Sequence, residues 1–446
     1  MTVLRFSIPF LLTNILQACY GASDLFMVGW FSNAAGISAV ATGGQVMQTI
    51  TGLAIGLTTG GTVIIAQYFG AGNRGAVVHA VKTILLVFGA IAISTTIGLV
   101  LFIDPICRLM SVPAEALQIT RQYLLICSAG IPFIVCYNAV SGILRGLGDS
   151  KTPLLLMIAA CLINVTTDLL FVGVMKWGAP GAAISTVFAQ IASLALAGFY
   201  LASKGLVRRY RNGSPRFQVH SARGILSVGL PAAMQEGLVN ISFLMITAMM
   251  NGMGLVASAS VGVVEKLIVF SMLPTTAFAS AVSAMTAQNL GAGYIHRAYK
   301  CMRFGIGLAL LFGIACFLCA QCNASGLVGL FTRDPAVIQT GALYLRSYSM
   351  DCILVCFVFC MNAFFTGCGH AAFPLIHSIL ATFVIRVPLS YLFSRKPNAS
   401  LLSVGLAAPA ATFLSLICCV GYLARWYKKE NMRTVAFSNC RLRHGH

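Results

Sequence analysis

The chain has 446 residues, of which 58% are hydrophobic and only 9% are charged, and its formal net charge is +19. An average water-soluble domain is about 25% charged, so this composition excludes a soluble globular protein. We expect an all-α integral membrane protein, because a helix satisfies its own backbone hydrogen bonds inside lipid.

Twelve apolar segments of the sequence are long enough to cross a bilayer, which requires about 20 residues of helix. Their approximate limits are 6–31, 37–65, 78–103, 119–144, 152–175, 179–202, 224–250, 255–284, 301–322, 337–366, 372–394 and 402–425. The sequence therefore predicts twelve transmembrane helices.

The positive charges fall unevenly on the two sides of these spans. Of the 29 Lys and Arg residues, twenty lie on one side, seven lie on the other, and Lys266 and Arg386 lie within spans. Since Lys and Arg concentrate on the cytoplasmic side, we expect a cell (inner) membrane protein with both termini in the cytoplasm. The charges sit in short loops rather than on one basic face, so no nucleic-acid partner is expected.

The two halves of the chain resemble each other at an offset of 221 residues. Gly70-Ala71-Gly72 matches Gly291-Ala292-Gly293, and both stretches are expected to form tight turns. With six spans in each copy, the copies share one orientation, which is a parallel repeat. We predict six-helix lobes at 1–202 and 224–425, a cytoplasmic basic linker at 203–223, and a cytoplasmic tail at 426–446.

Acidic residues inside the spans are the strongest indication of function, because burying a charge in lipid costs several kcal/mol unless the charge is paired or hydrated. The chain has ten acidic residues, and five of them fall in spans, namely Asp24, Asp168, Glu236, Glu265 and Asp351.

In the first lobe, Asp24, Asp168 and Thr186 each lie seven residues from the outer end of their predicted span, which is a depth of about 10 Å. Asn164 lies one helical turn before Asp168 and shares its face. This oxygen-rich group is suited to a hard cation such as Na⁺, or to a shared proton. The alternative is a purely structural hydrogen-bond network between helices.

In the second lobe, Glu236 lies near mid-depth without an obvious partner, so it is the best candidate for an acid that faces substrate. Glu265 and Asp351 are expected to be neutralised by ion pairs with Arg386 of the eleventh span. In the first span, Pro9 permits a kink that either responds to the site or is a static bend.

Three stretches carry a family resemblance. They are Tyr137-Asn138-Ala139 with Leu144-Arg145-Gly146-Leu147-Gly148-Asp149-Ser150-Lys151-Thr152-Pro153, the Gly-Ala-Gly after spans 2 and 8, and Arg386-Val387-Pro388-Leu389. Together with twelve spans in a six-plus-six repeat, they show that nearly the whole chain resembles the multidrug and toxic compound extrusion (MATE) family. Its DinF-type bacterial branch is the most similar.

The resemblance implies an antiporter, not an enzyme, that exports bulky organic, often cationic or amphipathic, compounds by alternating access. It implies Na⁺ or H⁺ as the coupling ion, no cofactor, small organic substrates, the lipid bilayer as surroundings, and a functional monomer. In that branch the coupling site lies in the first lobe, and its residues match Asp24, Asn164, Asp168 and Thr186, with Pro9 and Tyr20 in support. The NorM-type branch relies on second-lobe acids, for which the candidates are Glu236, Glu265 and Asp351, together with Arg386.

Three other functions have weaker support in the sequence. A flippase for lipid or polysaccharide precursors, from the same superfamily, is an alternative because Lys266 and Arg386 place positive charges inside the spans. An integral-membrane enzyme acting on lipids is disfavoured because the seven His residues are scattered without a catalytic pattern. A channel fits poorly with a two-lobe repeat.

Overall fold

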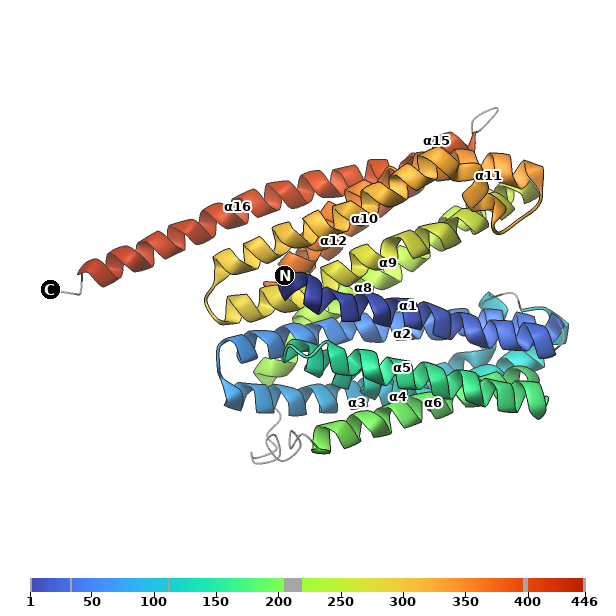
Figure 1. The fold of residues 1–446 in the computed structure, drawn as a ribbon, viewed down its shortest axis with the longest axis horizontal. Helices are drawn as coiled ribbons and strands as arrows, with labels where there is room; N and C mark the ends of the chain where they lie inside the picture. Colours follow the sequence, from blue (N-terminus) through green and yellow to red (C-terminus); the bar gives the residue numbers. More distant parts are fainter. Residues whose placement is uncertain (1, 33, 111, 204–218, 396–399, 444–446) are drawn as a thin grey trace. The chain divides into compact units, whose positions relative to one another are not determined.

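The computed structural model describes the whole chain except residues 1, 33, 111, 204–218, 396–399 and 444–446. Within this described part every regular element is a helix (Figure 1). Most of the predicted linker falls outside it. The first half of the chain forms α1 (Thr2–Phe31), α2 (Ala34–Gly70), α3 (Arg74–Leu109), α4 (Ala114–Gly146), α5 (Lys151–Asp168), the π-helix η1 (Leu169–Val174) and α6 (Gly178–Ser203).

The second half repeats this succession of long helices. It forms α8 (Val219–Gly252), α9 (Leu255–Gly291), α10 (Ile295–Gly329), α11 (Pro335–Tyr348), α12 (Asp351–Gly367), α13 (Ala372–Leu380), the π-helix η2 (Ala381–Arg386), α14 (Val387–Ser394), α15 (Leu401–Gly405) and α16 (Ala407–Arg443).

The number of predicted spans is confirmed in the described residues. Eleven helices are long and apolar enough to cross a membrane, and the total is twelve when α11 and α12, which are bent by 43° at their break, are counted as one span. The sequence predicted an unbroken helix over 337–366. The structure corrects this, because α11 ends at Tyr348 and α12 begins at Asp351.

A side chain from α10 compensates for this break. Gln321 donates hydrogen bonds from Nε2 to the backbone carbonyl of Arg346 at 2.8 Å and to the hydroxyl of Ser349 at 2.9 Å. A break inside a transmembrane helix frees backbone carbonyls, and in lipid another protein group must bind them. Gln321 therefore supplies a donor where the α11 helix ends.

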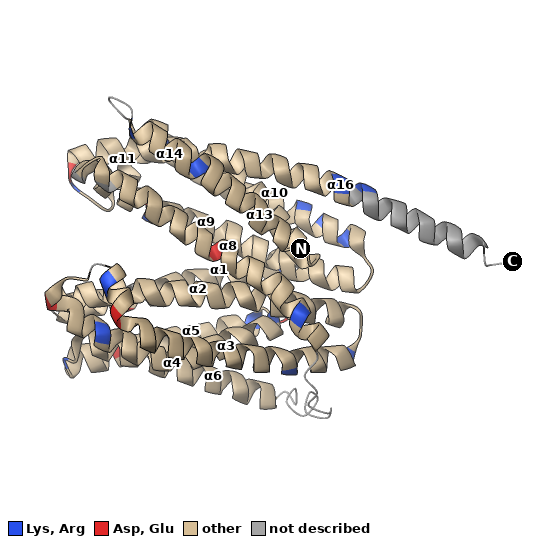
Figure 2. Ribbon diagram, turned by 180° about the vertical axis from the view of Figure 1, so that it is seen from behind, with Lys and Arg blue, Asp and Glu red and all other residues tan. Residues whose placement is uncertain are grey.

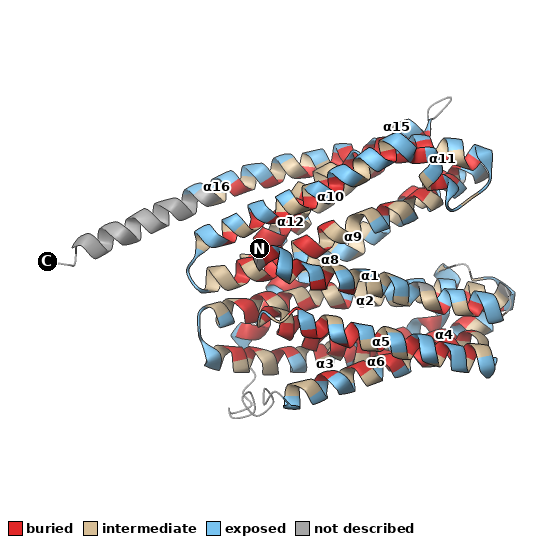
Figure 3. Cartoon of the chain, viewed as in Figure 1, coloured by how far each residue is buried: buried red, intermediate tan, exposed pale blue. Residues whose placement is uncertain are grey.

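The outer surface of the helices is apolar. Figure 2 shows charged residues mainly near helix ends, and Figure 3 shows exposed residues along helices such as α3. On α3, Leu101 is 70% exposed and Phe102 is 59% exposed. Such a surface is unfavourable in water but matches the hydrocarbon of a bilayer. The chain is therefore a multi-pass membrane protein.

The chain folds into two compact units, and each is described by itself. The first contains Met1–Asn240, Thr276–Leu308 and Ala363–Leu375, and the second contains Ile241–Thr275, Ala309–Asn362 and Ile376–His446. The first unit thus holds all helices of the predicted first lobe and also end segments of α8, α9, α10, α12 and α13. The units follow contacts in space, whereas the predicted lobes 1–202 and 224–425 follow the sequence repeat, so the lobe boundaries stay a prediction.

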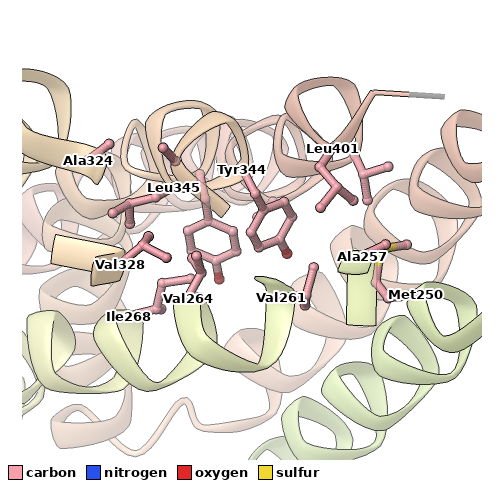
Figure 4. Packing of buried hydrophobic residues seen from close by; sticks show 14 of the residues in the cluster. Met250, Ala257, Val261, Val264, Ile268, Ala324, Val328, Tyr344, Leu345 and Leu401 are labelled. Carbon is pink, nitrogen blue, oxygen red and sulfur yellow. The ribbon is translucent and has the colours of Figure 1, made fainter. Parts of the chain in front are cut away.

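Each unit has its own apolar core. In the first unit, Ile84 and Phe88 of α3 pack with Ile131 and Val135 of α4. In the second unit, Figure 4 shows Tyr344 and Leu345 of α11 packed with residues of neighbouring helices, which are Val261, Val264 and Ile268 of α9, Ala324 and Val328 of α10, and Leu401 of α15. These buried side chains hold the helices that carry the polar residues.

Glycines at matching positions of the repeat end two pairs of helices. Gly72 and Gly293 have φ of +70° and +80°, and Gly148 and Gly369 have φ of +89° and +86°. A side chain strains this left-handed conformation, so glycine is the residue that ends such helices. The tight turns predicted at the Gly-Ala-Gly stretches are therefore confirmed, and the 221-residue repeat extends to backbone conformation.

Candidate cation-coupling site

Helices α1, α5 and α6 of the first unit pack against one another and bring the predicted first-lobe residues together. Asp24 comes from α1, Asn164 and Asp168 come from successive turns of α5, and Thr186 comes from α6. Asp24 is 6% exposed, and Asn164 and Asp168 are fully buried. Four polar groups that are far apart in sequence therefore share one interior region.

The Asp24 carboxylate accepts one hydrogen bond on each oxygen. Asn164 donates from Nδ2 to Oδ1 at 3.1 Å, and the Thr186 hydroxyl donates to Oδ2 at 2.7 Å. Hydrogen bonds to an ionised carboxylate are stronger than those between neutral groups. They fix the position of α1 relative to α5 and α6.

Three further hydroxyl groups complete the network, and the sequence analysis missed them. Ser23 donates to Asn164 Oδ1 at 3.0 Å, Ser185 donates to the Asn164 carbonyl at 2.9 Å, and the Thr167 and Ser185 hydroxyls lie 2.5 Å apart. Each of the three is the chain neighbour of a predicted residue. Their position in the sequence, directly beside a membrane-embedded carboxylate or threonine, is the signal that could have identified them.

Asp168 differs from Asp24 in its hydrogen bonding. Within the described residues neither carboxylate oxygen of Asp168 has a hydrogen-bond partner, although the side chain is fully buried. The carboxylate lies close enough to Asp24 for the two to interact electrostatically. A buried ionised carboxylate without a partner costs several kcal/mol. The arrangement is consequently favourable only when a positive charge or a proton joins it.

The two supporting residues of the first span have different surroundings. Tyr20 donates from its hydroxyl to the carbonyl of Thr186 at 3.2 Å, so it belongs to the network. Pro9 lies within α1, and its carbonyl accepts a hydrogen bond from Thr13 at 2.7 Å. Pro9 is fifteen residues from Asp24, about 22 Å along the helix, so it is not a ligand of this site.

The second-lobe candidates fall in different units. Glu236 belongs to the part of α8 in the first unit, where it is exposed. Glu265, Asp351 and Arg386 belong to the second unit.

The direct ion pairs predicted for Arg386 are not formed among the residues that the structure describes, where the one ion pair joins Arg121 to Asp104. Arg386 instead donates to the Tyr348 hydroxyl at 3.3 Å, and its guanidinium lies 4.5 Å from the centre of the Phe243 ring. Both Glu265 and Asp351 are within electrostatic range of it. The charge of Arg386, the last residue of the π-helix η2, thus interacts with two acids and with aromatic groups rather than with one paired carboxylate.

The described residues contain no group of three or more His, Cys, Asp or Glu side chains that is placed to hold a metal ion. The first-unit network contains two carboxylates, and its other groups are amides and hydroxyls. Transition metals prefer imidazole or thiolate ligands, whereas oxygen ligands suit hard cations. The chemistry of this network fits a hard cation or a proton.

Comparison with known proteins identifies the family. The MatE family model matches residues 9–170 and again residues 231–392, so its two matches begin 231 − 9 = 222 residues apart. The chain belongs to the MATE family of multidrug efflux transporters, and it is a transporter rather than an enzyme.

Two relatives cover nearly the whole chain. One is a probable multidrug resistance protein YoeA of Bacillus subtilis, 27% identical over 96% of this chain and 95% of its own length. Another is an FAD transporter of Shewanella oneidensis, 26% identical over 95% of this chain and 94% of its own length.

A solved structure agrees with the fold. It is described as the outward-facing conformation of a multidrug resistance MATE family transporter of the MOP superfamily. It matches with a TM-score of 0.88 at 23% identity and covers 97% of this chain and 96% of that chain. At this level of identity the likeness establishes the fold, and the site must be argued from this chain's own residues.

Proposed function

We propose that this protein is a cation-coupled antiporter that exports bulky organic compounds and that the coupling cation, Na⁺ or H⁺, binds between Asp24 and Asp168. The observation that carries the proposal is the Asp168 carboxylate, which is fully buried, lacks hydrogen-bond donors in the described part of the chain, and lies near a second carboxylate. A cation or proton removes the electrostatic cost of this pair.

The neighbouring oxygen atoms favour this position. Asn164 Oδ1 and the hydroxyls of Ser185 and Thr186 lie in the same hydrogen-bond network. Hard cations bind carboxylate, amide and hydroxyl oxygens. A sodium ion at Asp168 would recruit these oxygens as ligands, whereas a proton would let one carboxyl group donate to the other.

Binding is coupled to transport through α1. Thr186 and Asn164 hold Asp24 to α6 and α5, so a cation that takes oxygens from this network changes how α1 packs. In an alternating-access cycle, cation entry from outside releases the exported compound, and the loaded protein then turns inward. The cation drives the cycle only because it binds the two states with different affinities.

The proposed substrate class rests on the family and on the names of its members. The relatives' names include multidrug resistance and FAD transport. We propose small amphipathic organic substrates, with Glu236 as a residue facing them, a monomer as the functional form, and cytoplasmic termini in the cell membrane. We assign no nucleic-acid partner and no cofactor beyond the coupling ion.

Efflux of a cationic dye from cells that lack other pumps tests the proposal, with a Na⁺ gradient alone and then a pH gradient alone. Asp24→Asn should abolish efflux driven by the effective gradient. Asp104→Asn is the matched control, because Asp104 is an exposed carboxylate paired with Arg121. Efflux that survives Asp24→Asn contradicts the proposed site. Absence of efflux under both gradients favours the lipid-precursor flippase.

A further inference from the structure

Two glutamines make reciprocal hydrogen bonds between the halves of the repeat, inside the first unit. Gln67 of α2 donates from Nε2 to the carbonyl of Gly367 at 3.0 Å, and Gln288 of α9 donates from Nε2 to the carbonyl of Gly146 at 2.9 Å. The donors are 288 − 67 = 221 residues apart, and the acceptors are 367 − 146 = 221 residues apart. The two bonds are therefore equivalent under the repeat.

Both acceptors are helix ends. Gly146 is the last residue of α4, and Gly367 is the last residue of α12. The last carbonyls of a helix lack a partner within that helix and carry partial negative charge. Each glutamine thus satisfies an end carbonyl that belongs to the opposite half of the chain.

The same region contains a second symmetric contact, in which backbones approach closely. A Cβ atom on Gly70 would lie 2.0 Å from the carbonyl oxygen of Gln288, and a Cβ atom on Gly291 would lie 2.0 Å from the carbonyl oxygen of Gln67. The obstacle is backbone in both cases, so it cannot rotate away. The ends of α2 and α9 pack this closely only because both positions are glycine.

The contacts lie on the side of the membrane that the charge pattern assigns to the cytoplasm. The turns after α2, α4, α9 and α12 all belong to that side, next to basic residues such as Arg74, Lys151 and Arg297. We propose that Gln67 and Gln288 form a symmetric glutamine pair that holds the cytoplasmic side of the transporter closed and must separate when it opens inward. This inference rests on the proposed alternating-access function.

Hydrogen bonds of this kind suit a reversible gate. When the halves separate, water reaches the glutamine amides and the end carbonyls and replaces the lost bonds. The net contribution of each bond is therefore modest, about a fivefold change in the closed-to-open ratio. Loss of both bonds should change the ratio by about 25-fold if they act independently.

Accessibility of a native thiol measures the gate without reference to any substrate. Cys368 follows Gly367 directly and is partly exposed. A membrane-impermeant maleimide is added to inside-out and to right-side-out vesicles, and labelling of Cys368 is read by peptide mass spectrometry. Gln67→Ala and Gln288→Ala should each increase the Cys368 labelling rate about fivefold in inside-out vesicles, and the double variant should exceed both.

Two matched variants separate the gate from a general loss of structure. Gln45→Ala removes an exposed glutamine from the same helix α2 and should leave labelling unchanged. Gln67→Glu keeps the side-chain volume but replaces the donor with a carboxylate that cannot donate when ionised. It should open the gate at least as much as Gln67→Ala.

A steric test is independent of hydrogen bonding. Gly291→Ala should raise Cys368 labelling by about tenfold or more, because its Cβ atom would lie 2.0 Å from a backbone oxygen and would force the two helix ends apart. Gly262→Ala on the same helix α9 is its control, since a Cβ atom there meets nothing within 4 Å.

The inference is overturned if labelling in both glutamine variants and in Gly291→Ala equals that of the controls, or if labelling rises only in right-side-out vesicles. Failure of the proposed antiport function has a different signature. In that case the wild-type protein shows no gradient-driven efflux, while the labelling differences between variants and controls remain.

Discussion

The Thr186 hydroxyl donates a hydrogen bond of 2.7 Å to Asp24 Oδ2, and this bond joins α6 to α1 across 162 residues of sequence. Asn164 binds the other oxygen of the same carboxylate. Asp24 is thus held on both sides, whereas Asp168 has no hydrogen-bond partner within the described residues. This asymmetry between two neighbouring carboxylates is the basis of the first two predictions.

Thr186→Val should weaken coupling without unfolding the protein. Valine has a similar shape but cannot donate to Asp24, so the carboxylate loses one of its two fixed bonds. We expect the cation concentration for half-maximal efflux to rise by about tenfold, the lower end of the range for residues that orient metal ligands. Dye efflux measured across a series of cation concentrations gives this value.

Thr166→Val is the control for that measurement. Thr166 is exposed on α5, and its hydroxyl donates to the Leu162 carbonyl of its own helix. An equal change in both variants would mean that the hydroxyl of Thr186 has no special part in coupling.

Asp168→Asn should stabilise the cation-free protein and abolish coupling. The substitution replaces a buried charge with a neutral amide, which is less costly to bury, so it should raise the free energy of unfolding by about 1–3 kcal/mol. Thermal melting of the purified protein in detergent, without the coupling cation, measures this change. A lower melting temperature for Asp168→Asn would show that the carboxylate is satisfied in the protein.

The wild-type protein should in turn gain stability when the cation is added. At a concentration of 100 times its Kd, a bound cation contributes about 2.7 kcal/mol. Asp168→Asn should lose this gain, and the exposed Asp104→Asn should keep it. A gain in both variants would place the bound cation elsewhere.

Gln321→Leu should destabilise the second unit, because it removes the donor that binds the Arg346 carbonyl at the break between α11 and α12. We expect a loss of about 1–3 kcal/mol, the cost of leaving a polar group without a partner where lipid offers no hydrogen bonds. Gln118→Leu, at an exposed glutamine of α4, should have little effect. Melting temperatures of both variants and the wild type decide the matter.

Arg386→Gln should lower the melting temperature more than Arg395→Gln. Both arginines lie over an aromatic ring, Phe243 and Tyr391 respectively, but Arg395 is exposed. Loss of the Arg386 charge removes a positive charge that interacts with both Glu265 and Asp351, and such a loss is costly in an apolar interior.

A double variant shows whether Asp351 is one of the acids that Arg386 compensates. Asp351→Asn should restore part of the stability lost in Arg386→Gln, since non-additivity reveals direct coupling between two sites. Strictly additive effects on melting temperature would contradict electrostatic coupling between this pair.

The sequence by itself determined the class of protein, the number of spans and the repeat. Apolar segments of spanning length are forced into helices, because lipid offers no hydrogen bonds to the backbone. The same rule made Asp24 and Asp168 conspicuous, since a carboxylate inside a span demands an explanation. Equal depth along each predicted helix then correctly grouped Asp24, Asp168 and Thr186 before any contact was known.

Contacts between helices were decided only by the tertiary structure. Helical periodicity fixes depth and face, but it does not fix the rotation of one helix against another. The sequence could therefore mark Ser23 and Ser185 as neighbours of predicted residues, but not show which groups they bind. The predicted direct ion pairs of Arg386 were wrong for the same reason. The helices are rotated so that Tyr348 and Phe243 lie against its guanidinium.

The break after Tyr348 could not be predicted for a related reason, since the apolar segment continues across it. The break is stabilised by a hydrogen-bond donor on α10, which the sequence does not place there. Likewise, the repeat could be read from Gly70 and Gly291, but the sequence did not reveal that their helices meet. Side-chain packing, which depends on all neighbours at once, decides which polar groups of a membrane protein share one site.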